Sequence, residues 1–493
     1  MTVTPLSRLA QTPSDGASLD PQDWTQLRAQ AHRMLDDMLD YVAQIRERPV
    51  WAPMPQEVRD HFRAGIPAEP TPLQEVHREF MEYVLPYAGG NVHPGFMGWV
   101  QGGGTVTGML AEMLAGGLNA NLGGRDHAPI EVERQMVAWV RQLFGFPESA
   151  SGLFVTGTSM ANLLAVLVAR TSRLGKAGRH RGIGQVGGQL RAYASNGVHG
   201  CIAQAMDLAG FGSGALRLVP VDAASRMEVA ALRAMIAHDR AAGLQPFLVI
   251  GSAGTVDVGA IDDLKSIAAA CQQENLWFHV DGAYGALGML SPAVAPRLDG
   301  IGDADSIAFD FHKWGQVPYD AGFLMVKDGD QHYETFASPA AYLRREARGM
   351  AAGSPWPCDF GPDLSRGFRA LKAWFTLKVH GADAIGATIT RSCELARYLE
   401  QRIRDEPALE LLAPAQLNIV CFRYRAGDRA NADIVTALQE AGIAAPSTTM
   451  LDGKLAIRAA LFNHRTRQED LDALVDGVLR LGAEWTRKSL SVV

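Results

Sequence analysis

The stretch Ser306–Gln316, SIAFDFHKWGQ, decides the fold, because an apolar strand ends there in a cluster of polar residues. The stretch Asn275–Ala286, NLWFHVDGAYGA, has the same plan, with an apolar run that ends in an acidic residue. Strands separated by helices predict an α/β fold with a mainly parallel sheet covered on both faces. Ligands bind at the carboxyl ends of such strands, so we expect the site there. Further apolar runs of strand length alternate with helical patterns at Gly152–Val155, Arg191–Ser195, Leu216–Val221, Pro246–Ala253 and Gly322–Val326.

Composition and charge exclude several classes of protein. The chain has 493 residues, enough for about three folding units. Its net charge is −7 and its pI is about 6.0, which argues against nucleic-acid binding or a polybasic membrane protein. No apolar run is long enough to cross a membrane, and the first residues lack an export signal. Five scattered cysteines without a CxxC pair indicate reduced thiols, so we expect a cytoplasmic protein.

Changes in the sequence pattern divide the chain into four parts. Residues 1–20 are polar, and we expect a disordered leader. Residues 21–86 combine helical apolar spacing with a proline-rich stretch, which predicts a helical segment that packs on a second subunit. Residues 87–385 hold the alternating strands and helices of a large domain. Residues 386–493 begin with a long helix and are expected to form a small α+β domain.

Lys313 follows the strand Ser306–Asp310 and is flanked by Trp314. Burial beside an indole ring disfavours the charged form of an amine, so this lysine can serve as a neutral nucleophile. A surface lysine at the end of a strand is the alternative interpretation of this stretch taken alone.

Asp281 also follows an apolar run, and two small residues, Gly282 and Ala283, come directly after it. A carboxylate beside residues that leave room for a flat ring can pair with a protonated pyridine nitrogen. An aspartate that caps a turn is the alternative.

Two further stretches place polar groups after strands. Residues 156–159 join a strand to a helix, where backbone N–H groups, hydroxyls and the helix dipole suit a phosphate. This stretch is neither a Walker loop nor GxGxxG, and an ordinary helix cap is the alternative. His199 lies at a loop-to-helix junction and can stack on a flat ring, unless it is structural. Together these groups fit pyridoxal 5'-phosphate better than other cofactors.

The sequence resembles the group II pyridoxal-phosphate-dependent amino-acid decarboxylases, the aromatic-L-amino-acid decarboxylase family, over residues 20–485. This resemblance implies an aspartate-aminotransferase-like fold (fold type I) with a seven-stranded-type sheet. It also implies a homodimer whose N-terminal helices pack across subunits, with residues 87–385 as the cofactor-binding domain. The pairing of HVDGAYGA with a later HKW is specific to this family. The motifs that carry the resemblance are HVDGAYGA (279–286), DFHKWGQ (310–316), SAGTVDVGAIDDL (252–264) and RGFRALKAWFTLKVHGADAIG (366–386).

The resemblance assigns roles to individual residues. Lys313 corresponds to the lysine that forms the Schiff base, and Asp281 to the partner of the pyridine nitrogen. His199 corresponds to the histidine that stacks on the ring, and Ala283 to the small residue on the opposite face of the ring.

The remaining cofactor contacts are implied in the same way. Thr158 and Ser159 correspond to the phosphate cup. His312 falls where the family often adds a cofactor contact, and Thr255 lies in a turn that approaches the ring. No metal is expected.

Aromatic residues bear on the substrate and on the product. The segment HPGFMGWV (93–100) resembles the family's substrate-pocket segment, and its Phe96 and Trp99 favour a flat or apolar side chain. Many family members have a loop tyrosine that assists protonation of the substrate's Cα, and Trp356 falls at or beside that position here. An indole N–H is a far poorer acid than a phenol.

The resemblance therefore implies decarboxylation of an L-amino acid, expected to be aromatic, to the amine and CO₂ through a Schiff base on Lys313. The alternative is oxygen-dependent decarboxylation and deamination to an aldehyde, which accompanies loss of the loop hydroxyl in the family. Two further functions stay open. One is that of an aminotransferase or desulfurase, for which Cys358 would be the loop cysteine, and the second is that of a non-catalytic dimeric scaffold.

Overall fold

The computed structural model describes residues 18–184, 188–338 and 343–490. The expected leader over residues 1–20 therefore lies almost wholly outside the described residues. Within the part of the chain that is described, none of the helices has both the length and the apolar character needed to span a bilayer.

The described chain forms two compact parts, one made of residues 18–44 and 54–88 and the other of residues 45–53 and 89–490. Residues 45–53 belong with the second part because Val50 packs against Phe96 and Ala445. The sequence pattern had placed them in the N-terminal segment. The boundaries expected at residues 86 and 385 stay proposals.

The first part is helical, as the apolar spacing predicted. Asp23 caps α1 by accepting hydrogen bonds from two backbone N–H groups of its first turn. The side chain of His77 in α3 lies 3.4 Å from the carboxylate of Asp37 in α1, which links these helices. The α-helices among the described residues of this part are α1 (Trp24–Ala43), α2 (Gln56–His61) and α3 (Leu73–Glu79).

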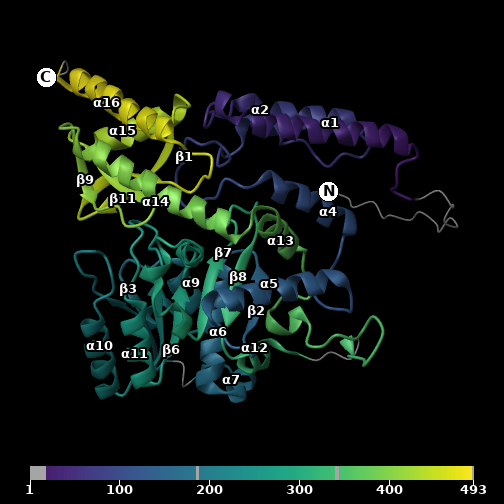
Figure 1. Cartoon of the computed structure of the whole chain (residues 1–493), viewed down its shortest axis with the longest axis vertical. Coiled ribbons are helices and arrows are strands. Elements are labelled where there is room, and N and C mark those ends of the chain that lie inside the picture. Colours follow the sequence, from purple (N-terminus) through teal and green to yellow (C-terminus); the bar gives the residue numbers. More distant parts are fainter. Residues whose placement is uncertain (1–17, 185–187, 339–342, 491–493) are drawn as a thin grey trace, which may run out of the picture. The chain divides into compact units, whose positions relative to one another are not determined.

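The second part is built around a seven-stranded sheet (Figure 1). Its strand pairs are parallel except those of β8, which runs antiparallel to both of its neighbours. The structure therefore confirms the predicted α/β fold and the mainly parallel sheet. In spatial order the strands are β2 (Ser151–Val155), β8 (Gly322–Val326), β7 (Ser306–Asp310), β6 (Trp277–Asp281), β5 (Gln245–Ser252), β3 (Leu190–Ser195) and β4 (Leu216–Val219).

Both faces of this sheet are buried. In β2, Phe154 belongs to the hydrophobic cluster on one face, whereas Leu153 and Val155 belong to the cluster on the other. Because side chains alternate along a strand, helices must cover both faces. The helices on the Leu153 face are α6 (Thr158–Leu174) and α9 (Cys201–Leu208), and those on the Phe154 face are α5 (Ala128–Phe144), α10 (Val229–Ala241) and α11 (Leu264–Glu274).

The strand register brings the functional stretches to one edge. Ser252 at the end of β5 pairs with Asp281 at the end of β6, and Asp281 pairs with Ala308 in β7. Gly322 of β8 pairs with the last residue of β7 and with the last residue of β2. Helix α6 begins shortly after β2 ends. The carboxyl ends of the central strands and the N-terminus of α6 therefore meet.

A second, five-stranded sheet lies mostly in the C-terminal region, where a small α+β unit was expected. Its edge strand β1 comes from early in the chain and pairs in parallel with β11, with Phe96 beside Ala445. A strand of two residues has too little pattern to be predicted. The strands, in spatial order, are β1 (Phe96–Met97), β11 (Ala445–Leu451), β12 (Lys454–Ala460), β10 (Ile419–Tyr424) and β9 (Leu409–Ala413), with α14 (Ala382–Arg404), α15 (Asp428–Glu440) and α16 (Gln468–Leu490) packed on them.

Candidate active site

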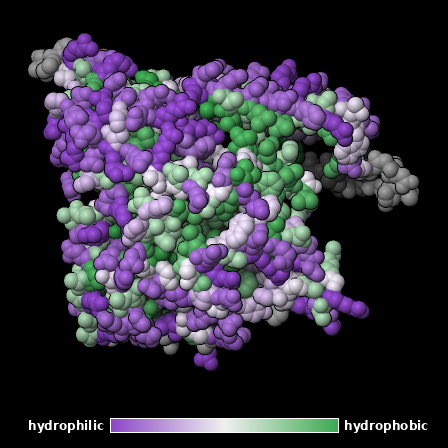
Figure 2. Space-filling model, viewed as in Figure 1, coloured by the Kyte–Doolittle hydropathy of each residue, from purple (hydrophilic) through white to green (hydrophobic). Residues whose placement is uncertain are grey.

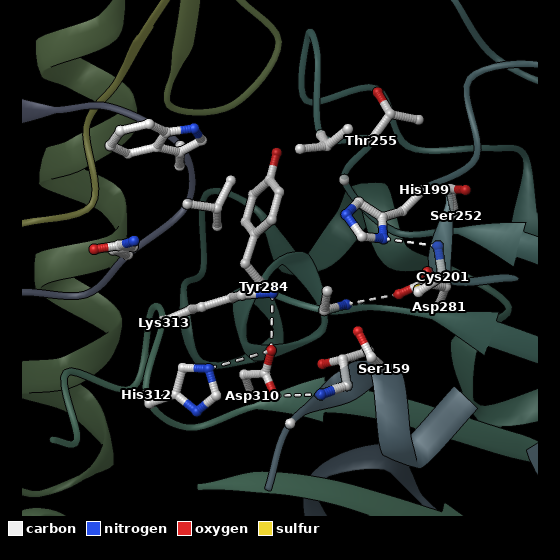
Figure 3. A pocket seen from close by; sticks show the side chains of 18 of the residues that line it. Ser159, His199, Cys201, Ser252, Thr255, Asp281, Tyr284, Asp310, His312 and Lys313 are labelled. Atoms are coloured by element: carbon white, nitrogen blue, oxygen red, sulfur yellow. Dashed lines mark hydrogen bonds and ion pairs between the residues drawn. The ribbon is translucent and has the colours of Figure 1, made fainter. Parts of the chain in front are cut away.

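A cavity of about 670 Å³ lies at the edge where β5, β6 and β7 end (Figure 3). Strands β11 and β12 of the second sheet also contribute to its wall, through Ser447, Thr448 and Arg458. The cavity brings together most of the residues singled out from the sequence, namely Trp99, Thr158, Ser159, His199, Thr255, Asp281, Ala283, His312 and Lys313.

The side-chain amine of Lys313 lies 2.8 Å from Oδ2 of Asp310. Asp310 is the last residue of β7 and is buried, and its Oδ1 accepts the backbone N–H of Thr158 at 2.7 Å. One carboxylate therefore connects the lysine to the N-terminus of α6. Asp310 was not among the predicted residues, although an acidic residue three positions before the lysine, at the end of a strand, was a visible signal.

His312 lies beside the same carboxylate. Its Nε2 is 3.5 Å from Oδ2 of Asp310, and its Nδ1 accepts the backbone N–H of Ala321 at 3.0 Å. Because Nδ1 accepts, Nε2 carries the proton of the neutral ring. Burial lowers the pKa of His312, and the charge of Asp310 partly opposes this. The ring of Tyr319 packs on that of His312, with 4.2 Å between centroids.

Asp281 ends β6 and is only 6% exposed. Its Oδ1 accepts the backbone N–H of Ala283 at 3.2 Å, and its Oδ2 accepts the side-chain amide of Asn162 at 3.1 Å. Burial raises the pKa of this carboxyl, and the nearby Lys313 and His199 oppose the rise. A cationic ring nitrogen in the cavity would favour the charged carboxylate, so Asp281 fits the pyridine ring of pyridoxal phosphate.

The N-terminus of α6 lines the cavity, but its groups are arranged differently from the prediction. The backbone N–H of Thr158 is used by Asp310 and is therefore not free. The Thr158 hydroxyl is buried and has no hydrogen-bond partner among the described residues. Buried hydroxyls are normally paired, so this group fits a phosphate oxygen at a helix N-terminus. Ser159 lines the cavity beside it.

His199 and Thr255 line the cavity in different ways. His199 is exposed, and its Nδ1 accepts the backbone N–H of Cys201 at 3.2 Å, which orients the ring. Figure 3 shows this imidazole turned into the pocket. The Thr255 hydroxyl accepts the backbone N–H of Ala260 at 3.0 Å, so it closes a turn and shapes the wall.

Two residues predicted for the substrate pocket do not line the cavity. Trp356 is 1% exposed, and its indole N–H donates to the backbone oxygen of Ala352 at 2.7 Å. The guanidinium groups of Arg345 and Arg125 lie over its ring. The indole is therefore packed among neighbouring residues of the protein and does not face the cavity. Phe96 is 4% exposed and packs with Val50 and Ala445, because β1 turns it into that cluster.

The cavity wall also includes two residues that the sequence analysis missed. Arg458 is buried, and its guanidinium donates to Ser447 and to backbone oxygens of Trp99 and of residues 256–257. A cation held so firmly favours an anionic group such as an amino-acid carboxylate. Tyr319 is 48% exposed and adds a phenol. Arg458 reaches the cavity from the second sheet, so no local pattern marks it. Tyr319 follows Lys313 by six residues, and this closeness in the sequence was a signal.

Comparisons with known proteins match nearly the whole chain. Residues 55–425 match the family described as the pyridoxal-dependent decarboxylase conserved domain. The chain is 32% identical over 484 residues to an aromatic-L-amino-acid decarboxylase of Bacillus atrophaeus, covering 96% of this chain and 98% of that protein. It is 27% identical over 464 residues to a phenylacetaldehyde synthase of Arabidopsis thaliana, covering 90% and 94%. The crystal structure of Oryza sativa TDC with PLP and tryptamine shares the fold, with a TM-score of 0.87, 23% identity and coverage of 95% and 100%.

Proposed function

The chain belongs to the pyridoxal-dependent decarboxylase family, and from this premise we propose that it converts an aromatic L-amino acid to the corresponding amine and CO₂. Family membership makes it a carboxy-lyase that depends on pyridoxal 5'-phosphate. The observation that carries the proposal is that Lys313, Asp281 and the exposed Trp99 line one cavity.

The described residues fit the cofactor. Lys313 would hold its aldehyde carbon, Asp281 its ring nitrogen, and Thr158 and Ser159 its phosphate. When bound, pyridoxal phosphate supplies a ring that accepts the electron pair left at Cα as CO₂ departs. His199, which lines the same cavity, would stack on the cofactor ring.

The chain's own residues provide charge and orientation. Asp310 holds the amine of Lys313 at 2.8 Å and fixes the start of α6 through Thr158. The burial of Asp281 strengthens its interaction with a cation, because little water surrounds the carboxylate to screen its charge. The imidazole of His199 and the phenol of Tyr319 are side chains on the wall that can carry a proton to Cα.

Two features support an aromatic amino acid as substrate. Trp99 is 60% exposed and Tyr319 is 48% exposed, and both line the cavity. Flat, partly apolar rings pack favourably against an aromatic side chain. The buried charge of Arg458 supports a substrate with a carboxylate. The Bacillus atrophaeus relative, named for aromatic L-amino acids, agrees with this substrate class.

An aldehyde product is the second candidate. The segment that contains Trp356 brings no phenol to the cavity among the described residues, and one relative is a phenylacetaldehyde synthase.

Cys358, which a desulfurase would need, does not line the cavity, and burial raises the pKa of its thiol.

A product assay tests both candidates. Purified holoenzyme would be given phenylalanine, tyrosine, tryptophan, dihydroxyphenylalanine, glutamate and 2,4-diaminobutyrate in turn, and CO₂, amine, aldehyde, ammonia, peroxide and oxygen uptake would be measured. Amine equal to CO₂ without peroxide, from an aromatic substrate, supports the proposal. Aldehyde with ammonia and peroxide supports the second candidate. Turnover of the aliphatic substrates alone contradicts the proposed substrate class.

A homodimer in the cytoplasm completes the proposal. Helix α4 (Val106–Leu118) exposes Met113, Leu114 and Leu118, and α13 (Arg369–His380) exposes Val379. Figure 2 shows hydrophobic surface gathered over the region of α4. Exposed apolar surface of this kind marks protein interfaces. The five cysteines are free thiols, which supports a reducing compartment. Light scattering that gives the mass of a single 53.1 kDa chain would contradict the dimer.

A further inference from the structure

Asp281 has a buried hydrogen-bond partner on α6, Asn162, which does not line the cavity. Asn162 is fully buried, and its side-chain amide nitrogen lies 3.1 Å from Oδ2 of Asp281. Its Oδ1 lies 2.8 Å from Nε2 of His279, which is also fully buried. A chain of polar groups therefore runs from the acidic residue of the site into the core of the protein.

The direction of the hydrogen bonds in this chain follows from the chemistry of its members. A charged carboxylate only accepts, so Asn162 must present its NH₂ group to Asp281 and its oxygen to His279. Nε2 of His279 then carries the proton, and Nδ1 accepts. Nδ1 lies 2.8 Å from the hydroxyl of Ser306, which donates to it. The hydroxyl in turn accepts the indole N–H of Trp277 at 2.9 Å.

Each link of this chain delivers a donor toward Asp281. Had His279 carried its proton on Nδ1, Asn162 would have to turn its oxygen toward the carboxylate, which requires a protonated Asp281. The tautomer of His279 and the charge of Asp281 are therefore coupled through one amide. Burial lowers the pKa of His279 to about 3, so this ring stays neutral at the pH where the enzyme would work.

We propose that Asn162, backed by His279, is the positioning residue that keeps Asp281 ionised and directed at the ring nitrogen of the cofactor. This inference rests on the proposed function, in which Asp281 faces that nitrogen. Asn162 does not itself line the cavity, so it acts on the site through Asp281. Its amide nitrogen also donates to Sγ of Cys201 at 3.3 Å, but burial raises the pKa of that thiol to about 11, so Asp281 is the charged partner.

The test compares two probes that differ only at the ring nitrogen. Apoenzyme is titrated with pyridoxal 5'-phosphate and with its analogue in which carbon replaces that nitrogen, and Kd is measured for each by fluorescence quenching. The ratio of the Kd of the analogue to the Kd of pyridoxal 5'-phosphate reports how strongly the protein recognises the nitrogen. A high ratio means that the nitrogen strengthens binding. A residue that only supports the fold would weaken both probes in parallel and leave the ratio unchanged.

Asn162→Leu is the principal variant, since it removes both polar groups at similar volume. We expect the ratio to fall about tenfold or more, because a hydrogen bond to a buried charge is lost. His279→Leu should lower the ratio less, since the Asn162 amide remains but loses the donor that orients it. His279→Gln should bring the ratio back toward the wild-type value, because the glutamine side chain can supply that donor. The matched control is His332→Leu, which removes another fully buried histidine that contacts none of these residues and should leave the ratio unchanged.

The outcomes separate the inference from its premise. If the wild-type protein binds both probes equally well, Asp281 does not recognise the ring nitrogen, and the inference falls with the proposed role of Asp281. If the wild type prefers the nitrogen probe and Asn162→Leu keeps that preference, the role of Asn162 alone is overturned. If Asn162→Leu does not fold, the pair His279→Leu and His279→Gln decides, and equal ratios in both would overturn it.

Discussion

The amine of Lys313 lies 2.8 Å from the carboxylate of Asp310, the last residue of β7, and the two form an ion pair. The same carboxylate accepts the first N–H of α6. The residue proposed to bind the aldehyde and the helix proposed to bind the phosphate are thus held at a fixed spacing by a single side chain. Both ends of the cofactor would depend on this contact.

Replacing Lys313 by alanine should reduce turnover to background. The variant keeps the cavity but lacks the amine that would bond to the cofactor. The visible absorbance of the lysine-bound cofactor should also disappear, as a spectrum of the purified protein would show. Lys327→Ala, at the end of β8, is a control that should keep the absorbance. Wild-type turnover by Lys313→Ala would end the assignment.

Asp310→Asn should weaken cofactor binding by about fivefold. An amide keeps the shape of the side chain, but neutral hydrogen bonds contribute roughly 1 kcal/mol less than bonds to a charged group. Equilibrium dialysis against pyridoxal phosphate measures the change. Asp320→Asn removes a nearby, more exposed carboxylate paired with Arg369, and should have little effect. An unchanged Kd in Asp310→Asn would show that the ion pair has no part in holding the cofactor.

Tyr319→Phe should shift the product from amine toward aldehyde. Tyr319 is a half-exposed residue on the cavity wall, whereas Trp356 is buried elsewhere. Burial raises the pKa of Tyr319, so the phenol keeps its proton at neutral pH. The ratio of amine to peroxide per CO₂ released measures the shift. The same ratio in variant and wild type would assign the proton transfer to another group, such as His199.

The buried His332 should make the protein less stable in acid. Burial lowers its pKa to about 3, from an ordinary value of 6.5. Below pH 6.5 the unfolded chain takes up a proton that the folded chain refuses, so stability falls as the pH drops toward 3. At pH 5 this amounts to about 2 kcal/mol.

His332→Gln should flatten this pH dependence between pH 7 and pH 5. Urea midpoints at each pH measure it in both proteins. Asp262 acts in the opposite direction, because burial raises its pKa to about 6, and comparison with the variant removes that contribution. Parallel pH profiles in the two proteins would contradict the prediction.

Arg366→Met should destabilise the fold by about 3–5 kcal/mol, because it leaves the carboxylate of Glu133 buried without its partner. Both side chains are nearly inaccessible, at 2% and 3% exposure. Arg366 also donates to the backbone oxygens of Leu122 and Phe154. Chemical denaturation measures the loss. Arg404→Met breaks a more exposed pair with Glu400 and should cost less than about 1 kcal/mol.

The sequence predicted the sheet, and the positions of Lys313 and Asp281 at its edge, because these signals are local. Lys313 and Asp281 each follow an apolar strand, and parallel strands bring their carboxyl ends to one edge. The role of Asp310 depends on a helix that begins more than a hundred residues earlier. No local pattern reports such a contact.

Phe96 and Trp356 lie away from the cavity for related reasons. An aromatic residue near a site in the sequence can face either the cavity or the core, and only tertiary packing decides between them. Phe96 pairs through β1 with the C-terminal sheet and turns inward, whereas Trp99, three residues later, stays exposed on the cavity wall.

The pairing of β1 with β11 has a consequence for engineering. Trp99 donates its backbone N–H to Ser447, and Arg458 donates to the backbone oxygen of Trp99. The two segments of the cavity wall, which are distant in the sequence, are therefore joined directly by hydrogen bonds. A chimaera that exchanges the C-terminal region of two relatives to transfer substrate preference must therefore also exchange residues 96–101. Otherwise the transferred part of the cavity wall loses the matching residues that it contacts in its parent protein.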